Sequence, residues 1–256
     1  MPRIELRGLV KRFGRTVAIS GLSALIEDRE LFAVVGPTAC GKTTLLRLIA
    51  GLIRPDKGEI LFDGVVVNDL PPPARRVRMV FQGHDYALFP HLVVYHARRW
   101  SNLSFPLRLR NQGLREISRR VRRVTRRLGI NRNLFPRRPG ELSEGQKQRV
   151  AVGKAIVLPP QILLLDEPLS HLDPPSRAKA REEIRELHRE LGTTTVYVTH
   201  DLAEAFLLAD RVAVMRVGRF EQVGTPREIL DSPANRFVSD FVGSYLDSVR
   251  RAFVWR

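Results

Sequence analysis

The sequence has little cysteine, few acidic residues for its length, and no long apolar run. Cys40 is the only cysteine, which excludes a disulfide within the chain and favours a reducing compartment. No apolar run approaches the roughly 20 residues that a membrane-spanning helix needs. The segment MPRIELRGLV also lacks the apolar core of a secretory signal. We therefore expect a soluble chain, or one attached to a membrane only through a partner.

Internal repeats and low-complexity segments are absent as well. The 256 residues suffice for one large domain or two modest ones. A hydrophobic content of 43% is ample for a packed core, so global disorder is not expected.

Positive charge is in excess, with 43 Lys and Arg against 27 Asp and Glu, a net charge of +16. Arginine is densest between Arg108 and Arg138, where Glu116 is the only acidic residue. Such a segment can contact nucleic acid, an anionic membrane surface or an acidic partner, or it can be a solvated helix face. Apolar residues at helical spacing favour an amphipathic helix with its arginines outward. These residues are Leu114, Ile117, Val121, Val124 and Leu128.

Short β-type segments alternate with helical ones on both sides of a helical, arginine-rich middle. This alternation predicts an α/β fold with a mostly parallel sheet covered on both faces, and a helical subdomain inserted at about 84–158. Strands are expected at 3–10, 17–27, 31–35, 60–67, 78–82, 162–166, 193–199 and 211–216, and a helix at 42–50.

A glycine-rich segment, GPTACGKT, fits the pattern G-x-x-x-x-G-K-[ST] between an apolar strand and a helix. Glycines let the backbone fold closely around phosphate, so that its N–H groups and the helix dipole face the anion. Lys42 is expected to reach the β- and γ-phosphates, and the Thr43 hydroxyl to ligate Mg²⁺. Cys40 is interpreted as a small filler, with a redox role as the alternative. The nucleotide contacts predicted here are Gly36, Pro37, Thr38, Ala39, Cys40, Gly41, Lys42, Thr43 and Thr44.

An acidic pair ends a second apolar strand, ILLLDE. Asp166 is expected to hold Mg²⁺, and Glu167 to polarise the attacking water. The alternative, a strand that merely ends in a solvated acidic turn, is weakened by the phosphate loop elsewhere in the chain.

The order of the remaining motifs resembles an ATP-binding cassette (ABC) ATPase. MVFQ…YALFPHL, LSEGQ, LLLDEPLSHLD, GTTTVYVTHD, ADRVAVM and EQVGTP…SPANRFV are most similar to importer ATPases for sugars, polyamines, sulfate or iron. The resemblance extends from Ile4 to about Gly243. It implies a P-loop NTPase cassette, 1–243, with an antiparallel N-terminal β portion. The core would be 1–83 and 159–243, the helical subdomain about 84–158, and a tail 244–256.

The resemblance also implies roles within one cassette. Phe13 in KRFG would stack on adenine, although a core phenylalanine is the alternative. Gln82 would sense Mg²⁺ and the catalytic water and couple the site to the permease. His200 would contact the γ-phosphate and position that water, as a catalytic residue with Glu167, Gln82 and Lys42.

Cassettes of this family pair head to tail, and this implies a set of contacts in trans. Ser143, Gly145 and Gln146 of one cassette would cover the ATP bound by the other, with Asp173 at the seam. The implied partners are permease subunits, a solute-binding protein, and an identical or related cassette, at the cytoplasmic face of the inner membrane. No nucleic acid is expected.

Three departures from the family pattern stand out. Glu144 replaces the first glycine of LSGGQ, and we expect reduced activity if its carboxylate points at the nucleotide. Residues 83–85 and 96–101 look like insertions in the region that receives the permease. The regulatory β-barrel that commonly follows in sugar- and sulfate-type members is not present after Gly243, so a minimal or shortened cassette is expected.

Two other function classes remain open at this stage. One is an ABC ATPase that acts on nucleic acid or ribosomes, suggested by the arginine cluster and opposed by the single cassette without a coiled coil. The other is a non-hydrolysing cassette, suggested by Glu144 together with the insertions.

Overall fold

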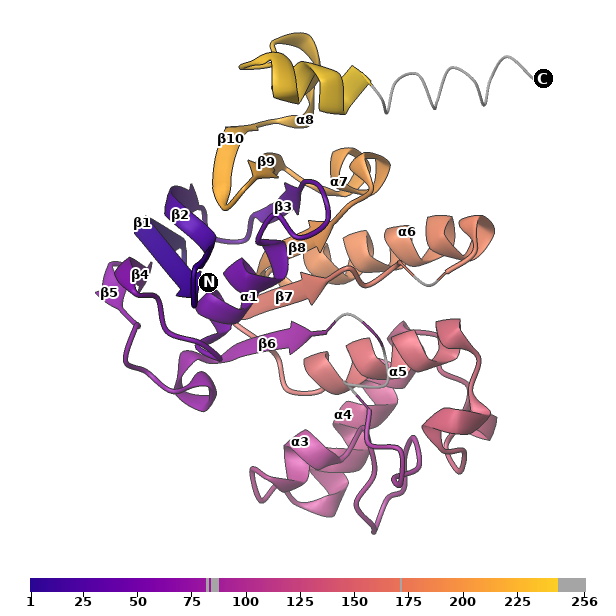
Figure 1. Cartoon of the computed structure of the whole chain (residues 1–256). Coiled ribbons are helices and arrows are strands. Elements are labelled where there is room, and N and C mark those ends of the chain that lie inside the picture. The colour runs from indigo at the N-terminus through magenta and orange to yellow at the C-terminus, as the bar shows by residue number, and fades with distance from the viewer. Residues whose placement is uncertain (82, 84–87, 171, 244–256) are drawn as a thin grey trace, which may run out of the picture. The chain divides into compact units, whose positions relative to one another are not determined.

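The computed structural model describes all residues except 82, 84–87, 171 and 244–256 (Figure 1). The chain divides into two compact units. The first contains Met1–Val77, Gln161–Asp166 and the described residues from His188 onward, and the second contains Arg78–Pro160 and Glu167–Leu187. The predicted domain boundaries remain an interpretation of the sequence.

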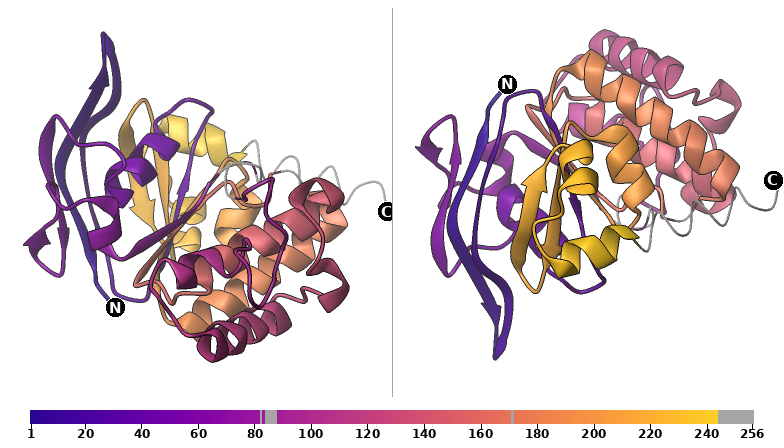
Figure 2. Two further views of the ribbon diagram at one scale, coloured as in Figure 1. Left: turned by 90° about the horizontal axis from the view of Figure 1, so that it is seen from below. Right: turned by 90° about the horizontal axis from the view of Figure 1, so that it is seen from above.

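The first unit begins with an antiparallel sheet in the order β2-β1-β4-β5. Its strands are β1 (Ile4–Phe13), β2 (Thr16–Ile26), β4 (Lys57–Phe62) and β5 (Val65–Val66). Asp63 and Gly64 connect β4 to β5 with φ values of 50° and 81°, the left-handed pair that a tight hairpin turn requires. Both views of Figure 2 show the β1–β2 hairpin as a long ribbon at the rim of this unit.

The second sheet has the order β10-β9-β3-β8-β7-β6. Val77, the first residue of β6, is the last residue of the first unit before the chain enters the second. β3 runs parallel to β8 and β9, and β7 parallel to β8, whereas β10 is antiparallel to β9. Val35 is level with Thr199, and Asp166 with Val198, so the carboxyl ends of β3, β7 and β8 lie at one edge. The strands are β3 (Leu31–Val35), β6 (Val77–Val80), β7 (Ile162–Asp166), β8 (Thr194–Thr199), β9 (Arg211–Arg216) and β10 (Arg219–Gly224).

Helices of the first unit pack on this sheet. α1 (Lys42–Ala50) contacts β7 and β8, and α7 (Leu202–Leu208) contacts β3 and β8. A buried apolar cluster joins α7 to β3 and β9 and includes Ile229 of α8 (Pro226–Asp231). A short 3₁₀ turn, η1 (Pro72–Arg75), precedes β6.

Apart from the residues of β6, the second unit is built of helices in the part of the chain that the structure describes. α4 buries Ile117, Val121 and Val124, which confirms the predicted amphipathic helix, but Leu114, expected on the same face, is 49% exposed at the first turn. Gly153 of α5 lets that helix approach Val124 closely. The elements are α3 (Phe105–Arg108), α4 (Leu114–Arg127), η2 (Arg132–Leu134), η3 (Pro139–Glu141), α5 (Glu144–Ile156) and α6 (Pro174–Leu191), the last of which continues into the first unit.

The predicted fold class is confirmed, and the predicted elements differ from the observed ones mainly at their ends. The segment expected as one strand pair at 60–67 is β4 followed by only two residues of β5. Among the described residues, no helix is both long enough and apolar enough to cross a membrane.

Candidate functional site

The phosphate loop connects β3 to α1 and depends on two glycines. Gly41 has φ 112°, and a Cβ there would lie 2.5 Å from the Ala18 carbonyl oxygen. A Cβ on Gly36 would overlap the carbonyl oxygen of Met215. Both neighbours are backbone atoms, so neither glycine can be replaced without moving the sheet around the loop.

A turn far away in the sequence supports this loop, and we did not predict it. The Gly218 N–H donates to the Cys40 carbonyl oxygen at 2.8 Å, and the Ser20 N–H donates to the Gly218 carbonyl oxygen at 2.9 Å. The turn between β9 and β10 thus connects the loop to β2. The one local signal is a glycine, Gly218, directly after the expected β-type segment 211–216, which is typical of a turn.

Lys42 begins α1 and its ammonium lies within the loop. Its Nζ donates to the carbonyl oxygens of Gly36 at 2.8 Å and Pro37 at 2.9 Å. The side chain is thereby held over the loop whose N–H groups would face a phosphate. The first N–H groups of a helix have no carbonyl partner inside the helix, so Thr43 and Thr44 add donors at the same place.

Thr43 and Asp166 meet at the edge where β7 ends. The Thr43 hydroxyl donates to Oδ1 of Asp166 at 3.1 Å, and Asp166 is only 1% exposed. A hydroxyl and a carboxylate side by side are oxygen ligands of the kind that Mg²⁺ prefers. Within the described residues, no cluster of three or more His, Cys, Asp and Glu side chains could hold a metal by itself. A metal here would therefore share its ligands with phosphate and water.

Cys40 is buried in the loop, 6% exposed. Burial raises the pKa of its thiol, and the nearby Lys42 ammonium offsets only part of that rise. A thiol that stays protonated is a poor nucleophile, which supports the filler interpretation over a redox role.

Phe13 ends β1 at the surface and is 51% exposed. Lys11 Nζ lies 5.7 Å from its ring centroid. An exposed ring at the tip of a hairpin is available to stack on a base, and it is not a core side chain.

His200 follows β8 in a turn that several hydrogen bonds fix. The Asp201 side chain caps α7 by accepting from the Ala203 N–H at 2.8 Å. Behind the turn, Glu204 is 3% exposed and accepts from the Tyr197 and Thr199 hydroxyls, both at 2.8 Å. Sequence reasoning missed Glu204, and its only signal is a carboxylate four residues after His200 on the helix that follows.

Glu167 comes directly after Asp166 and starts the next part of the second unit. Its φ is 45°, a conformation that costs energy for a residue other than glycine and is common at functional sites. The Ser170 hydroxyl and N–H both donate to the Glu167 carbonyl oxygen, at 3.0 and 3.3 Å. A tight turn therefore fixes the backbone of this carboxylate.

The signature segment forms the start of α5. Ser143 caps the helix: its hydroxyl accepts from the Gln146 N–H at 3.4 Å, and the Gln146 side-chain oxygen accepts from the Ser143 N–H at 3.0 Å. This capping box orients the helix N-terminus, where N–H groups favour an anion.

Glu144 follows the cap and forms an ion pair within its own helix. The Lys147 ammonium donates to Oε1 of Glu144 at 2.8 Å. The Lys147 side chain is 15% exposed and that of Glu144 is 52% exposed. The negative charge at position 144 is thus compensated locally, and the structure shows how a carboxylate fits where the family has glycine.

A cavity of about 380 Å³ lies beside this helix start, entirely within the second unit. Ser143, Glu144 and Gly145 line it together with Asp173. Asp173 accepts from the Ser176 N–H at 3.1 Å, and the Ser176 hydroxyl and N–H hold the pKa of Asp173 below its ordinary value. The structure therefore brings Ser143, Gly145 and Asp173 to one hollow. Gln82 and residues 84–85 lie outside the described residues.

Comparison with known proteins identifies the family. The sequence pattern described as "ABC transporter" matches residues 19–170. The chain belongs to this family.

Curated relatives of this cassette are import ATP-binding proteins. The trehalose/maltose protein of Thermococcus litoralis is 46% identical over 97% of the chain and 68% of the relative. The sn-glycerol-3-phosphate protein of Rhizobium meliloti is 49% identical over 95% of the chain and 68% of the relative. The spermidine/putrescine protein of Oleidesulfovibrio alaskensis is 46% identical over 93% of the chain and 62% of the relative.

Solved structures agree with this assignment. The protein cbiO1 of Clostridium perfringens, part of the ABC transporter complex cbiONQ, has a TM-score of 0.80 at 31% identity, covering 90% of the chain and 91% of that structure. The dimeric cassette MJ0796, bound to ADP and Pi in a post-hydrolysis state, has a TM-score of 0.76 at 28% identity, covering 88% and 99%. The predictions of an ABC cassette that binds and hydrolyses ATP, and of its likeness to import subunits, are confirmed.

Proposed function

We propose that this cassette drives the uptake of a small polar solute, with two cassettes closing head to tail over ATP. The observation that carries the proposal is the Thr43–Asp166 hydrogen bond beside the buried Lys42. It places a hydroxyl, a carboxylate and an ammonium where a triphosphate and its cation would need them.

The roles within one cassette follow from these positions. Thr43 and Asp166, with Gln82, would hold Mg²⁺, which when bound neutralises charge on the phosphate oxygens. Lys42 and the N–H groups of the loop bind the β- and γ-phosphates. Glu167 accepts a proton from the attacking water, and His200 orients that water against the γ-phosphate. The exposed ring of Phe13 stacks on adenine.

The second cassette completes the site. The Ser143 hydroxyl, the Gly145 N–H and Gln146 contact the γ-phosphate bound by the partner, and Asp173 lies at the seam between the two. Closure on ATP and reopening after hydrolysis would move the permease subunits. Both copies can be this chain or one can be a related cassette.

Partners outside the pair are inferred from the named relatives. Permease subunits would hold the cassettes at the cytoplasmic face of the inner membrane, and a solute-binding protein would deliver the solute. Sugars, glycerol phosphate and polyamines are the solute classes in the names of the relatives. A pull-down from native membranes, followed by identification of the co-purifying permease, tests this part.

Hydrolysis is tested by phosphate release from purified protein with Mg²⁺ and ATP. Replacing the base, Glu167→Gln, should slow release by roughly 100-fold or more and leave ATP binding nearly unchanged. Lys42→Ala should abolish both, because the loop loses its phosphate-binding ammonium. A Glu167→Gln protein that hydrolyses ATP at the wild-type rate would contradict the role assigned to this carboxylate.

A further inference from the structure

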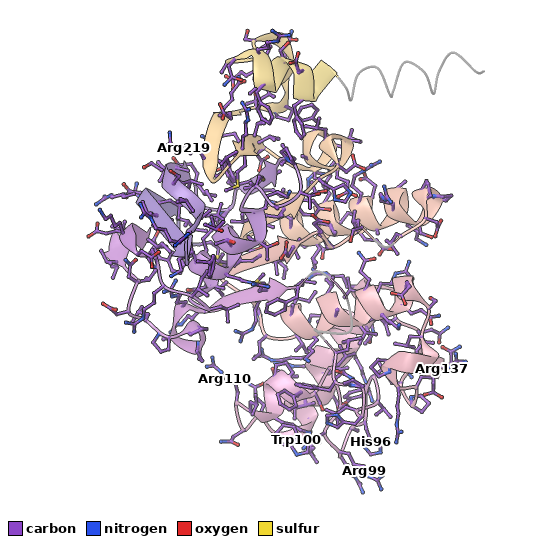
Figure 3. The ribbon with its side chains drawn as sticks, in the orientation of Figure 1. His96, Arg99, Trp100, Arg110, Arg137 and Arg219 are labelled. Atoms are coloured by element: carbon purple, nitrogen blue, oxygen red, sulfur yellow. The ribbon has the colours of Figure 1, made fainter. Side chains whose placement is uncertain are left out.

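A face of the second unit combines arginines with exposed apolar side chains. We call it the basic–aromatic patch, and it consists of His96, Arg98, Arg99, Trp100, Leu109 and Arg110. All six are exposed; Trp100 keeps 47% of its surface in solvent and Leu109 keeps 63%. Figure 3 shows His96, Arg99 and Trp100 projecting outward together from one end of this unit.

Hydrogen bonds at its base hold the loop of the patch in place. The Asn102 side chain donates to the Leu92 carbonyl oxygen at 2.9 Å, and the Ser101 and Ser104 hydroxyls are 2.6 Å apart. Ser101, Asn102 and Ser104 are fully buried. The residues that project beyond them are therefore presented from a fixed base.

The patch is formed by the loop at 96–100 and by residues at the end of α3, and these two segments contact each other. The Arg108 side chain donates to the Ala97 carbonyl oxygen at 3.1 Å, and its guanidinium lies 5.9 Å from the Trp100 ring centroid. The Trp100 ring is 5.2 Å from that of Phe105. The loop at 96–100 therefore lies against α3, and Leu109 and Arg110 directly follow that helix.

Positive charge continues along α4. Exposed arginines recur there at intervals of four and three residues, which places them on one side of the helix. They are Arg115, Arg119, Arg122 and Arg126. Glu116 is the only acidic residue between His96 and Arg138, and it pairs with Arg119 and Arg120.

We propose that the basic–aromatic patch binds the surface of a bilayer that contains anionic phospholipid. Arginines attract the anionic headgroups, and tryptophan is the side chain that favours the boundary between headgroups and acyl chains. The exposed leucines at 109 and 114 separate this proposal from nucleic-acid binding. An aliphatic side chain gains from insertion among acyl chains but offers neither stacking nor hydrogen bonding to a base.

None of these side chains belongs to the ATP-binding machinery described above. Residues 96–101 belong to the region that the family resemblance assigns to the permease, so the patch would give this region a lipid contact beside the permease. The test therefore needs neither ATP nor a permease, and its result is independent of the transport proposal.

Flotation of the purified full chain with vesicles measures the binding. Protein should float with phosphatidylcholine vesicles that contain phosphatidylglycerol, and not with phosphatidylcholine alone. Arg98→Ala/Arg99→Ala should weaken binding by about 25-fold, since each arginine near an anionic surface contributes about fivefold.

The matched control removes the same charge elsewhere. Arg227 and Arg236 belong to the first unit, with side chains 91% and 95% exposed. Arg227→Ala/Arg236→Ala should change vesicle binding by less than about threefold, because each of these arginines pairs with an aspartate four residues further along the chain, Asp231 or Asp240, and neither belongs to the patch. Unchanged thermal unfolding and ATP hydrolysis in both variants would show that the fold is intact.

Tryptophan fluorescence reports insertion. In a Trp255→Phe background, Trp100 is the only tryptophan, and lipids with brominated acyl chains should quench its emission. The proposal is overturned if vesicles do not bind, if both double variants lose binding equally, or if Trp100 is not quenched. Patch-dependent binding of RNA without quenching would instead assign this face to nucleic acid.

Discussion

We propose that the phosphate loop of the first unit and the signature turn of the second bind the same kind of anion, and the structure builds the two segments by different means. Around the loop, backbone atoms fill the space next to Gly36 and Gly41. Around the signature turn, a Cβ on Gly145 would meet only the Leu172 side chain, at 3.7 Å, an ordinary contact. Backbone atoms around Gly36 and Gly41 leave no room for side chains in the phosphate loop, whereas the signature turn is shaped by the Ser143 cap and by the Glu144–Lys147 ion pair.

This difference explains where the sequence is allowed to vary. A side chain at Gly36 or Gly41 must displace the backbone of β9 or β2. At position 144 a glutamate is accommodated because its side chain extends over the helix surface to Lys147. The substitution therefore changes electrostatics at the turn and leaves its backbone in place.

The largest expected difference is between a methyl group added to the phosphate loop and one added to the signature turn. Gly41→Ala must place a Cβ against the Ala18 carbonyl oxygen at positive φ, which should cost about 3 kcal/mol and remove measurable ATP binding. Gly145→Ala should leave stability and nucleotide binding of the single cassette nearly unchanged. Thermal unfolding and titration with a fluorescent ATP analogue measure both.

Equal losses in these two variants would remove the contrast between a sterically fixed loop and an open turn. A stable Gly41→Ala protein that binds ATP normally would show that β2 can shift away from the loop.

An intermediate effect is expected from breaking the ion pair at the signature turn. Lys147→Met leaves the Glu144 carboxylate without this partner, so its repulsion of the γ-phosphate should weaken ATP-driven pairing by about tenfold at low salt. Lys147→Arg should behave as wild type. Adding Glu144→Gln to Lys147→Met should restore pairing, because the repelling charge is gone.

Pairing is measured by light scattering over a range of ATP concentrations. Glu144→Gly alone should improve it by no more than about threefold, because exposed ion pairs contribute little. If Lys147→Met pairs normally, the compensating role of Lys147 is wrong. If the double variant stays weak, Lys147 acts by some means other than its charge.

The smallest expected effect concerns the thiol in the loop. Because burial raises the pKa of Cys40, its thiol should stay protonated through neutral pH and react slowly with iodoacetamide. Labelling followed by mass spectrometry should show modification only after unfolding. Rapid labelling of the folded cassette at neutral pH would show that the loop opens on its own.

Much of the fold and of the site could be predicted from local patterns. The apolar runs at Leu31–Val35 and Ile162–Asp166 coincide with β3 and β7, since a strand buried on both faces has few polar residues. The glycine pattern located the phosphate loop because its chemistry depends on consecutive residues. Asp166 was assigned for the same reason, and its hydrogen bond to Thr43 joins the two motifs.

Contacts between distant segments could not be predicted in this way. The support of Cys40 by Gly218 depends on the pairing of β9 with β3, which no local pattern contains. Likewise, the buried Glu204 accepts hydrogen bonds from two hydroxyls of β8. Where β8 lies relative to α7 is defined only in the folded chain. The roles of all the site residues, those of the phosphate loop and of the signature turn included, stay predictions, and so do the domain boundaries.

The most direct test of the two-half site is the mass of the Glu167→Gln protein with ATP. The 29.1 kDa chain should double its mass in ATP and remain single in ADP. Ser143→Arg in the same background should bind ATP as a single cassette and fail to pair, because the blocked turn serves the partner. A Ser143→Arg protein that pairs as well as its parent, or a parent that stays single in ATP, would contradict the account.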